Sequence, residues 1–120
     1  MTKIKLDDDW FDASHSECIQ WLENNNCMDI LLKWNWEPYG DKEWRRKEKL
    51  GLAKRYPSRI LSPILRRMDC DDRLCATYPE VGQNECPVAM IHDFASEGWE
   101  GNSRWKSIAD WYEDTEAWQW

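Results

Sequence analysis

The longest regular pattern of apolar and polar positions in this chain lies between residues 28 and 36. Every second position there is apolar, namely Met28, Ile30, Leu32, Trp34 and Trp36. A period of two over this length predicts a β-strand at about 28–36, and Pro38-Tyr39-Gly40 would end it with a turn. A lone strand leaves its backbone groups unpaired, so we expect a small antiparallel sheet, with 3–6 and 73–78 as weaker candidate strands.

Two helices are predicted from capping residues in the first half of the chain. Ser14 and Glu17 have the spacing of a capping box, and the asparagines at 24–26 would end the helix that begins there. Asp41 can cap a second helix that runs to about residue 55, just before Pro57.

Three more helices are predicted in the second half. Ser62-Pro63 indicates another cap, and in this segment apolar residues recur at helical spacing, at Leu61, Ile64, Leu65 and Met68. Pro87 can open a helix over 88–95, and another is expected after residues 102–103, with Trp105, Ile108, Ala109 and Tyr112 on one face. The fold class is therefore α+β, a small sheet covered by four or five short helices, and a mainly α fold is the alternative.

The length of 120 residues fits one domain, spanning 1–120, without a metal or disulfide to stabilise it. No apolar run approaches the roughly 20 residues that span a bilayer, and the first residues lack the apolar stretch of a signal peptide. We therefore expect a cytoplasmic protein.

The five cysteines are odd in number and irregular in spacing, which is typical of reduced, mostly buried thiols. Cys70, Cys75, Cys86 and His92 could supply four zinc ligands, but they lack the closely spaced cysteine pair of zinc fingers. Clusters of acids such as Asp69, Asp71 and Asp72 could bind a divalent cation, but the side chains of consecutive residues do not all point to one metal site. We expect no metal, no cofactor and no catalytic residue.

Charge changes sign along the chain. Residues 1–40 carry eight acids and three bases, residues 41–73 six acids and eleven bases, and residues 74–120 nine acids and two bases, for a net charge of −7. The negative net charge disfavours binding of nucleic acid across the whole surface, although the segment 42–67 could still form a local basic patch. A basic protein surface is the simpler expected partner.

Ten tryptophans are many for a chain of this length, and rings next to carboxylates are typical of contact surfaces. One interpretation packs the C-terminal rings on the protein's own sheet. The other makes them a partner-binding surface together with Trp44, and its candidate residues are Trp44, Trp111, Glu113, Asp114, Glu116, Trp118 and Trp120.

These features favour a small acidic inhibitor that occludes a basic, nucleic-acid-binding surface of a target protein, and not an enzyme. In general type, though in no motif, the chain is similar to the small inhibitors that phages make against bacterial defence systems, anti-CRISPR proteins among them. An immunity protein that neutralises a toxin nuclease is the alternative. A nucleic-acid-binding regulator that uses the segment 42–67, and a zinc-stapled interaction module, belong to other classes. No membrane partner is expected.

Overall fold

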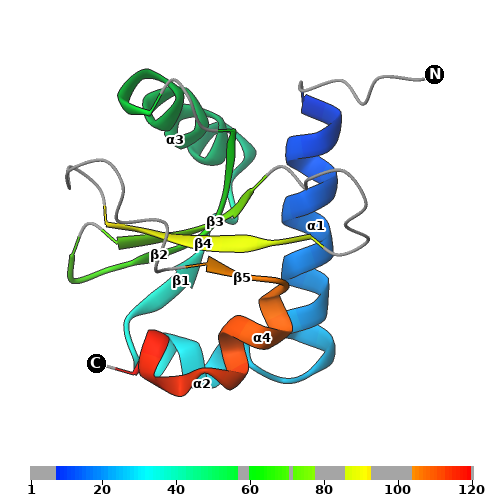
Figure 1. Cartoon of the computed structure of the whole chain (residues 1–120), viewed down its shortest axis with the longest axis vertical. Coiled ribbons are helices and arrows are strands. Elements are labelled where there is room, and N and C mark those ends of the chain that lie inside the picture. Colours follow the sequence, from blue (N-terminus) through cyan, green and yellow to red (C-terminus); the bar gives the residue numbers. More distant parts are fainter. Residues whose placement is uncertain (1–7, 57–59, 71, 78–85, 93–103, 120) are drawn as a thin grey trace.

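The computed structural model describes residues 8–56, 60–70, 72–77, 86–92 and 104–119 (Figure 1). The predicted strand at 3–6 and residue Tyr78 lie outside these ranges. In chain order, the elements are α1 (Asp8–Asn24), α2 (Met28–Lys33), β1 (Trp36–Pro38), α3 (Lys42–Arg55), β2 (Leu61–Arg67), β3 (Asp72–Thr77), β4 (Val88–His92), β5 (Arg104–Trp105), α4 (Ile108–Glu113) and the short 3₁₀ helix η2 (Thr115–Ala117).

The five strands form one antiparallel sheet in which sequence neighbours pair, in the order β1-β2-β3-β4-β5. This arrangement confirms the predicted α+β class and the predicted antiparallel sheet. The weaker strand candidate at 73–78 corresponds to β3.

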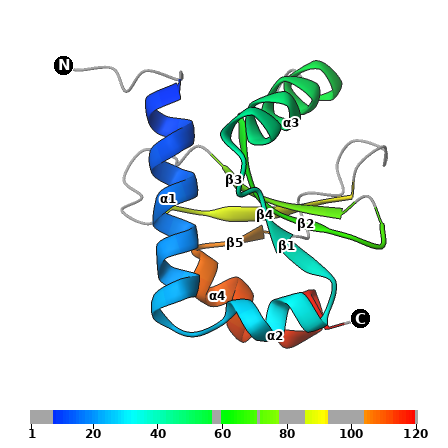
Figure 2. The ribbon, with the colours of Figure 1, turned by 180° about the vertical axis from the view of Figure 1, so that it is seen from behind.

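Helices cover both faces of the sheet, with α3 on one side and α2 and α4 on the other (Figures 1 and 2). Successive residues of β3 and β4 therefore enter different clusters. Cys75, Ala89 and Ile91 pack with Leu52 and Tyr56 at α3, whereas the alternate positions pack with α1, α2 and α4, namely Leu74, Ala76, Val88 and Met90.

Burial of both faces explains why the helices predicted over 61–68 and 88–95 are wrong. A strand buried on both sides reads as an unbroken apolar run, which periodicity alone cannot distinguish from a helix. Val88 to Ile91 form such a run in β4. In β2 the pairing shifts between Pro63 and Leu65, and a proline is tolerated inside a sheet at such an irregularity.

The strand predicted at about 28–36 is also wrong in its bounds. Residues 28–33 are helical, Leu31 is fully buried, and only Trp36 from the predicted strand lies in β1. Asn26 and Asn35 adopt positive φ angles of 57° and 70°, and asparagine tolerates this left-handed conformation well. Asn26 follows the end of α1, and Asn35 separates α2 from β1. The alternation of apolar residues over 28–36 did not reveal this break between a helix and a strand.

The helix capped by Asp41 is confirmed, since its carboxylate accepts from the amides of Glu43 and Trp44 at 2.8 and 3.4 Å. The capping box at Ser14 is wrong, because α1 already begins at Asp8. Ser14 is buried inside the helix, and its hydroxyl lies within hydrogen-bond distance of the Phe11 carbonyl, at 3.1 Å, and of Ser62 Oγ, at 3.0 Å.

The last predicted helix is present as α4, with the Ser107 hydroxyl accepting from the amide of Asp110. Its predicted start is wrong, because Trp105 lies in β5 and the helix begins at Ile108. Trp111, which the predicted apolar face of this helix did not include, is fully buried.

Candidate interaction surfaces

Charged residues divide between the two sides of the sheet. Helix α3 carries seven bases and two acids, whereas residues 108–119 carry four acids and no base. Because α3 and α4 cover opposite faces, this division of the sequence becomes a division in space (Figure 1). The molecule therefore offers a basic helix on one side and an acidic segment on the other.

The structure buries two of the predicted contact residues. Trp111 is fully buried and Trp118 is 1% exposed. Their rings lie 6.2 Å apart, and Trp111 contacts Trp36 edge-on at 5.4 Å. The expectation that these two rings face a partner is thus corrected, because they complete the hydrophobic core.

Hydrogen bonds hold the C-terminal segment in place. Trp36 Nε1 donates to the Trp118 carbonyl at 3.1 Å, and Trp118 Nε1 donates to the Tyr112 carbonyl at 2.9 Å. The stacked rings of Tyr112 and Trp118 add a contact at 5.1 Å. The segment is therefore part of the folded domain.

The predicted carboxylates of the same segment do lie on the surface. Glu113, Asp114 and Glu116 are all exposed, and Asp114 accepts from Trp105 Nε1 at 3.0 Å. Trp120 lies outside the described residues. The acidic half of the predicted site is available to a partner, whereas its described aromatic half is not.

Trp44 is half-buried on the other side of the sheet. Its ring lies 4.8 Å from the Tyr39 ring, and the Arg66 guanidinium lies 5.3 Å from its centre. Arg66 is itself paired with Glu37 at 3.3 Å. Trp44 packs within the protein and is separated from the C-terminal carboxylates with which it was grouped.

Several of the exposed apolar side chains lie at positions that the sequence pattern had placed on an apolar face. Ile30, Trp34 and Met68 are 41, 38 and 45% exposed. Ile30 and Trp34 are four residues apart, so they lie on the same side of the α2 turn. The signal that could have identified Trp34 is Asn35, whose left-handed conformation turns Trp34 outward and Trp36 inward.

Hydrogen bonds connect the turn after α2 with the residues that follow β2. The Met68 amide donates to the Asn35 carbonyl at 2.7 Å, and Asn35 Nδ2 donates to Asp69 at 3.5 Å. The Trp36 to Trp118 hydrogen bond joins the C-terminal segment to β1, two residues after Trp34 in the chain. We call the exposed acidic and apolar residues of these connected segments the acidic end, namely Ile30, Trp34, Met68, Asp29, Asp69, Glu113, Asp114 and Glu116.

The structure does not assemble the candidate zinc ligands. Cys75 belongs to the cluster beneath α3, whereas Cys86 packs against the cluster on the opposite face of the sheet. Cys86 forms a hydrogen bond with Cys18, and this bond together with burial raises the pKa of the Cys18 thiol. Among the described residues, no group of three or more metal-ligating side chains comes together.

Comparisons with protein-family models, curated proteins and solved structures yield no match to this chain. In the described ranges, no helix is long and apolar enough to cross a membrane.

Proposed function

We propose that this chain is a stoichiometric protein-binding inhibitor whose acidic end covers the basic, nucleic-acid-binding surface of a target protein. Two observations carry this proposal. Ile30, Trp34 and Met68 are exposed, and so are the carboxylates of the C-terminal segment, which the Trp36 to Trp118 hydrogen bond joins to β1. Apolar side chains supply burial at an interface, and carboxylates select arginine and lysine. The inhibitor acts in the cytoplasm by occlusion, without catalysis, metal or cofactor.

Within this surface, Trp34 is the proposed anchor. Tryptophan is enriched among the few interface residues that dominate binding energy, and a partly exposed ring can become buried when a partner docks. The buried Trp111 and Trp118 contribute indirectly, because they fix the backbone that presents Glu113, Asp114 and Glu116.

A phage inhibitor of a bacterial defence system, such as an anti-CRISPR protein, and an immunity protein against a toxin nuclease would use this surface in the same way. Both place carboxylates where phosphates of a nucleic acid would bind. Gene neighbourhood distinguishes them, because an immunity gene lies beside the gene of its toxin.

A nucleic-acid-binding regulator is the second candidate, and one observation favours it: α3 exposes Arg46, Lys47 and Lys54. Trp44 and Tyr56, which could have stacked on bases, are instead packed against the protein. This candidate predicts that the free protein retards DNA or RNA in a gel at physiological salt.

The test of the inhibitor proposal is affinity capture on the immobilised full chain, from a nuclease-treated lysate of the organism that encodes it. A captured protein is then purified, and the chain is titrated into its complex with nucleic acid. The chain should displace the nucleic acid at a one-to-one ratio. Trp34→Ala should weaken binding by about 2 kcal/mol or more, as expected for an interface anchor.

Leu50→Ala is the matched control, because Leu50 is an apolar side chain, 56% exposed, on α3. It should leave the affinity for the target unchanged. The proposal fails if Leu50→Ala weakens binding as much as Trp34→Ala, or if the captured protein keeps its nucleic acid at saturation. Capture of nucleic acid without a protein would support the regulator.

A further inference from the structure

Two of the five cysteines are in contact, although they lie far apart in the chain. Cys18 is in the second half of α1, and Cys86 lies just before β4. The two thiols share a hydrogen bond, and Cys86 packs against the core cluster to which Cys18 belongs. Contact between two thiols is the first geometric requirement for a disulfide.

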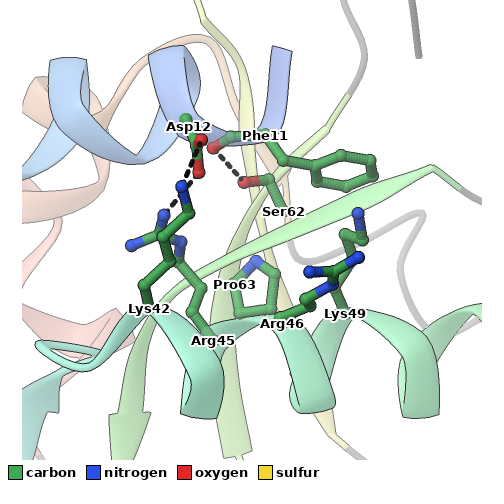
Figure 3. Close-up of a pocket in the computed structure, with 8 residues that line it drawn as sticks. All are labelled: Phe11, Asp12, Lys42, Arg45, Arg46, Lys49, Ser62 and Pro63. Atoms are coloured by element: carbon green, nitrogen blue, oxygen red, sulfur yellow. Dashed lines mark hydrogen bonds and ion pairs between the residues drawn. The ribbon is translucent and has the colours of Figure 1, made fainter. Parts of the chain in front are cut away.

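Polar contacts near the start of α1 hold this helix, and with it Cys18, against the rest of the domain (Figure 3). Asp12 pairs with Arg45 of α3. Ser62 Oγ of β2 donates to the Phe11 carbonyl at 3.1 Å. Cys18 itself is 1% exposed in the core. The helix therefore presents the Cys18 sulfur from a fixed backbone.

The backbone beside Cys86 is held by β3. The carbonyl of the next residue, Pro87, accepts from the Thr77 amide at 2.9 Å, and the Thr77 hydroxyl lies 3.4 Å from the same oxygen. Val88, which follows, is fully buried in β4. Cys86 is only half-buried, so a reagent in solution reaches this cysteine more easily than Cys18.

The hydrogen bond also makes the two thiols unequal in acidity. It lowers the pKa of Cys86 despite the opposing effect of burial, whereas the same bond together with burial raises the pKa of Cys18. This difference is expected when the Cys18 S–H donates to a Cys86 thiolate. Because the thiolate is the nucleophile in thiol–disulfide exchange, Cys86 is the more reactive member of the pair.

We propose that Cys18 and Cys86 form a reversible disulfide by exchange with a small disulfide such as oxidised glutathione. The Cys86 thiolate attacks one sulfur of oxidised glutathione, which forms a mixed disulfide and releases one glutathione thiolate. Cys18 then attacks the Cys86 sulfur, and its proton passes to the second departing glutathione. Two protein thiols are thereby oxidised to one disulfide, and oxidised glutathione is reduced to two molecules of glutathione.

This disulfide links α1 to the start of β4 and closes a loop that contains more than half of the chain. A crosslink across a long loop restricts the unfolded chain and so stabilises the folded state. Disulfides of this kind in a reducing compartment are usually transient and sense the redox state. The domain is therefore more stable under oxidising conditions than under reducing ones.

The experiment equilibrates the full chain with reduced and oxidised glutathione at a series of ratios. The protein carries Cys70→Ser, which removes an exposed thiol that could crosslink two copies and leaves four cysteines. Intact mass, thiol titration and peptide mapping should show the loss of two hydrogen atoms, two remaining thiols and a peptide that joins Cys18 to Cys86. The oxidised form should melt roughly 10 °C above the reduced form, and dithiothreitol should abolish the difference.

Matched variants in the same background separate the two steps. Cys86→Ser should keep its thiols and its melting temperature at every glutathione ratio, because the accessible thiol is gone. Cys18→Ser should stop at a mixed disulfide between Cys86 and glutathione, because no second thiol displaces it. Cys27→Ala removes a buried thiol that follows α1 and should still form the Cys18–Cys86 bond.

The proposal is overturned if the reference protein stops at a glutathione adduct, if another pair of cysteines is joined, or if no thiol is lost at the most oxidising ratio. A Cys18–Cys86 bond that leaves the melting temperature unchanged would overturn the stabilising role. Should Cys18→Ser fail to fold, the half-buried Cys86 still decides the result through Cys86→Ser.

Discussion

At the scale of single residues, His15 is held in one neutral form by its two neighbours. The Tyr39 carbonyl can only accept a hydrogen bond, so His15 Nε2 carries the proton at 3.1 Å from it. Arg45 can only donate, so His15 Nδ1 is the acceptor. Burial, and then the positive charge of Arg45, lower the pKa of His15 from 6.5 to about 4.

This lowered pKa predicts a pH-dependent stability. In the unfolded chain His15 takes up a proton as the pH falls below 6.5, whereas in the folded chain it does so only near 4. Protonation therefore favours the unfolded state, and the contribution of His15 to stability is lost as the pH falls from 6.5 to about 4. Urea unfolding of the wild type and His15→Gln across this window measures it.

Ordinary carboxylates also take up protons near pH 4, which changes the stability of both proteins. The informative quantity is therefore the difference in unfolding free energy between the wild type and His15→Gln. Wild type should lose more stability than His15→Gln between pH 6.5 and 5. Parallel curves for the two proteins would contradict the proposed neutral ring.

At the scale of elements, α3 depends on its N-cap. Asp41→Ala removes the acceptor of the Glu43 and Trp44 amides and should cost about 1 kcal/mol of folding free energy. Thermal unfolding would show this as a fall of roughly 4 °C. Asp41→Asn keeps a capping oxygen and should stay close to wild type, so equal losses in both variants would rule out a role for capping.

Elements like α3 could be predicted from the sequence because a local cap and a local stop define them. The strands β2 and β4 could not, because their identity depends on α3 covering the second face of the sheet, which no local pattern records. The acidic segment of the site was predicted from composition alone. The exposed ring of the site, Trp34, could not be predicted. The alternating pattern puts Trp34 and Trp36 on the same face, but the left-handed conformation of Asn35 between them turns Trp34 toward solvent and Trp36 into the core.

At the scale of the whole molecule, the C-terminal segment completes the core. Trp118→Ala would leave a cavity between Trp111 and Tyr112 and should cost about 3–5 kcal/mol, a large fraction of the stability of such a domain. Thermal or urea unfolding measures the loss. Glu116→Gln, on the same segment but exposed, should change stability by less than about 0.5 kcal/mol.

If the Trp118→Ala variant is as stable as the Glu116→Gln variant, the C-terminal segment is not part of the core, and its rings are better explained as a contact surface for a partner. The expected result instead means that truncations of this segment lower partner binding by unfolding the domain. Charge changes at Glu113, Asp114 and Glu116 are then the variants that report on binding alone.

The contrast between Trp34 and the buried rings also has an optical consequence. Trp36, Trp111 and Trp118 are in mutual contact and shielded from water, so they should couple in the near-ultraviolet circular dichroism spectrum and report on folding. Of the tryptophans that the structure describes, Trp34 is the most exposed, and the protein around it carries a net charge of −7. Caesium ions should therefore quench its fluorescence more strongly than iodide, and a docked partner should remove that difference.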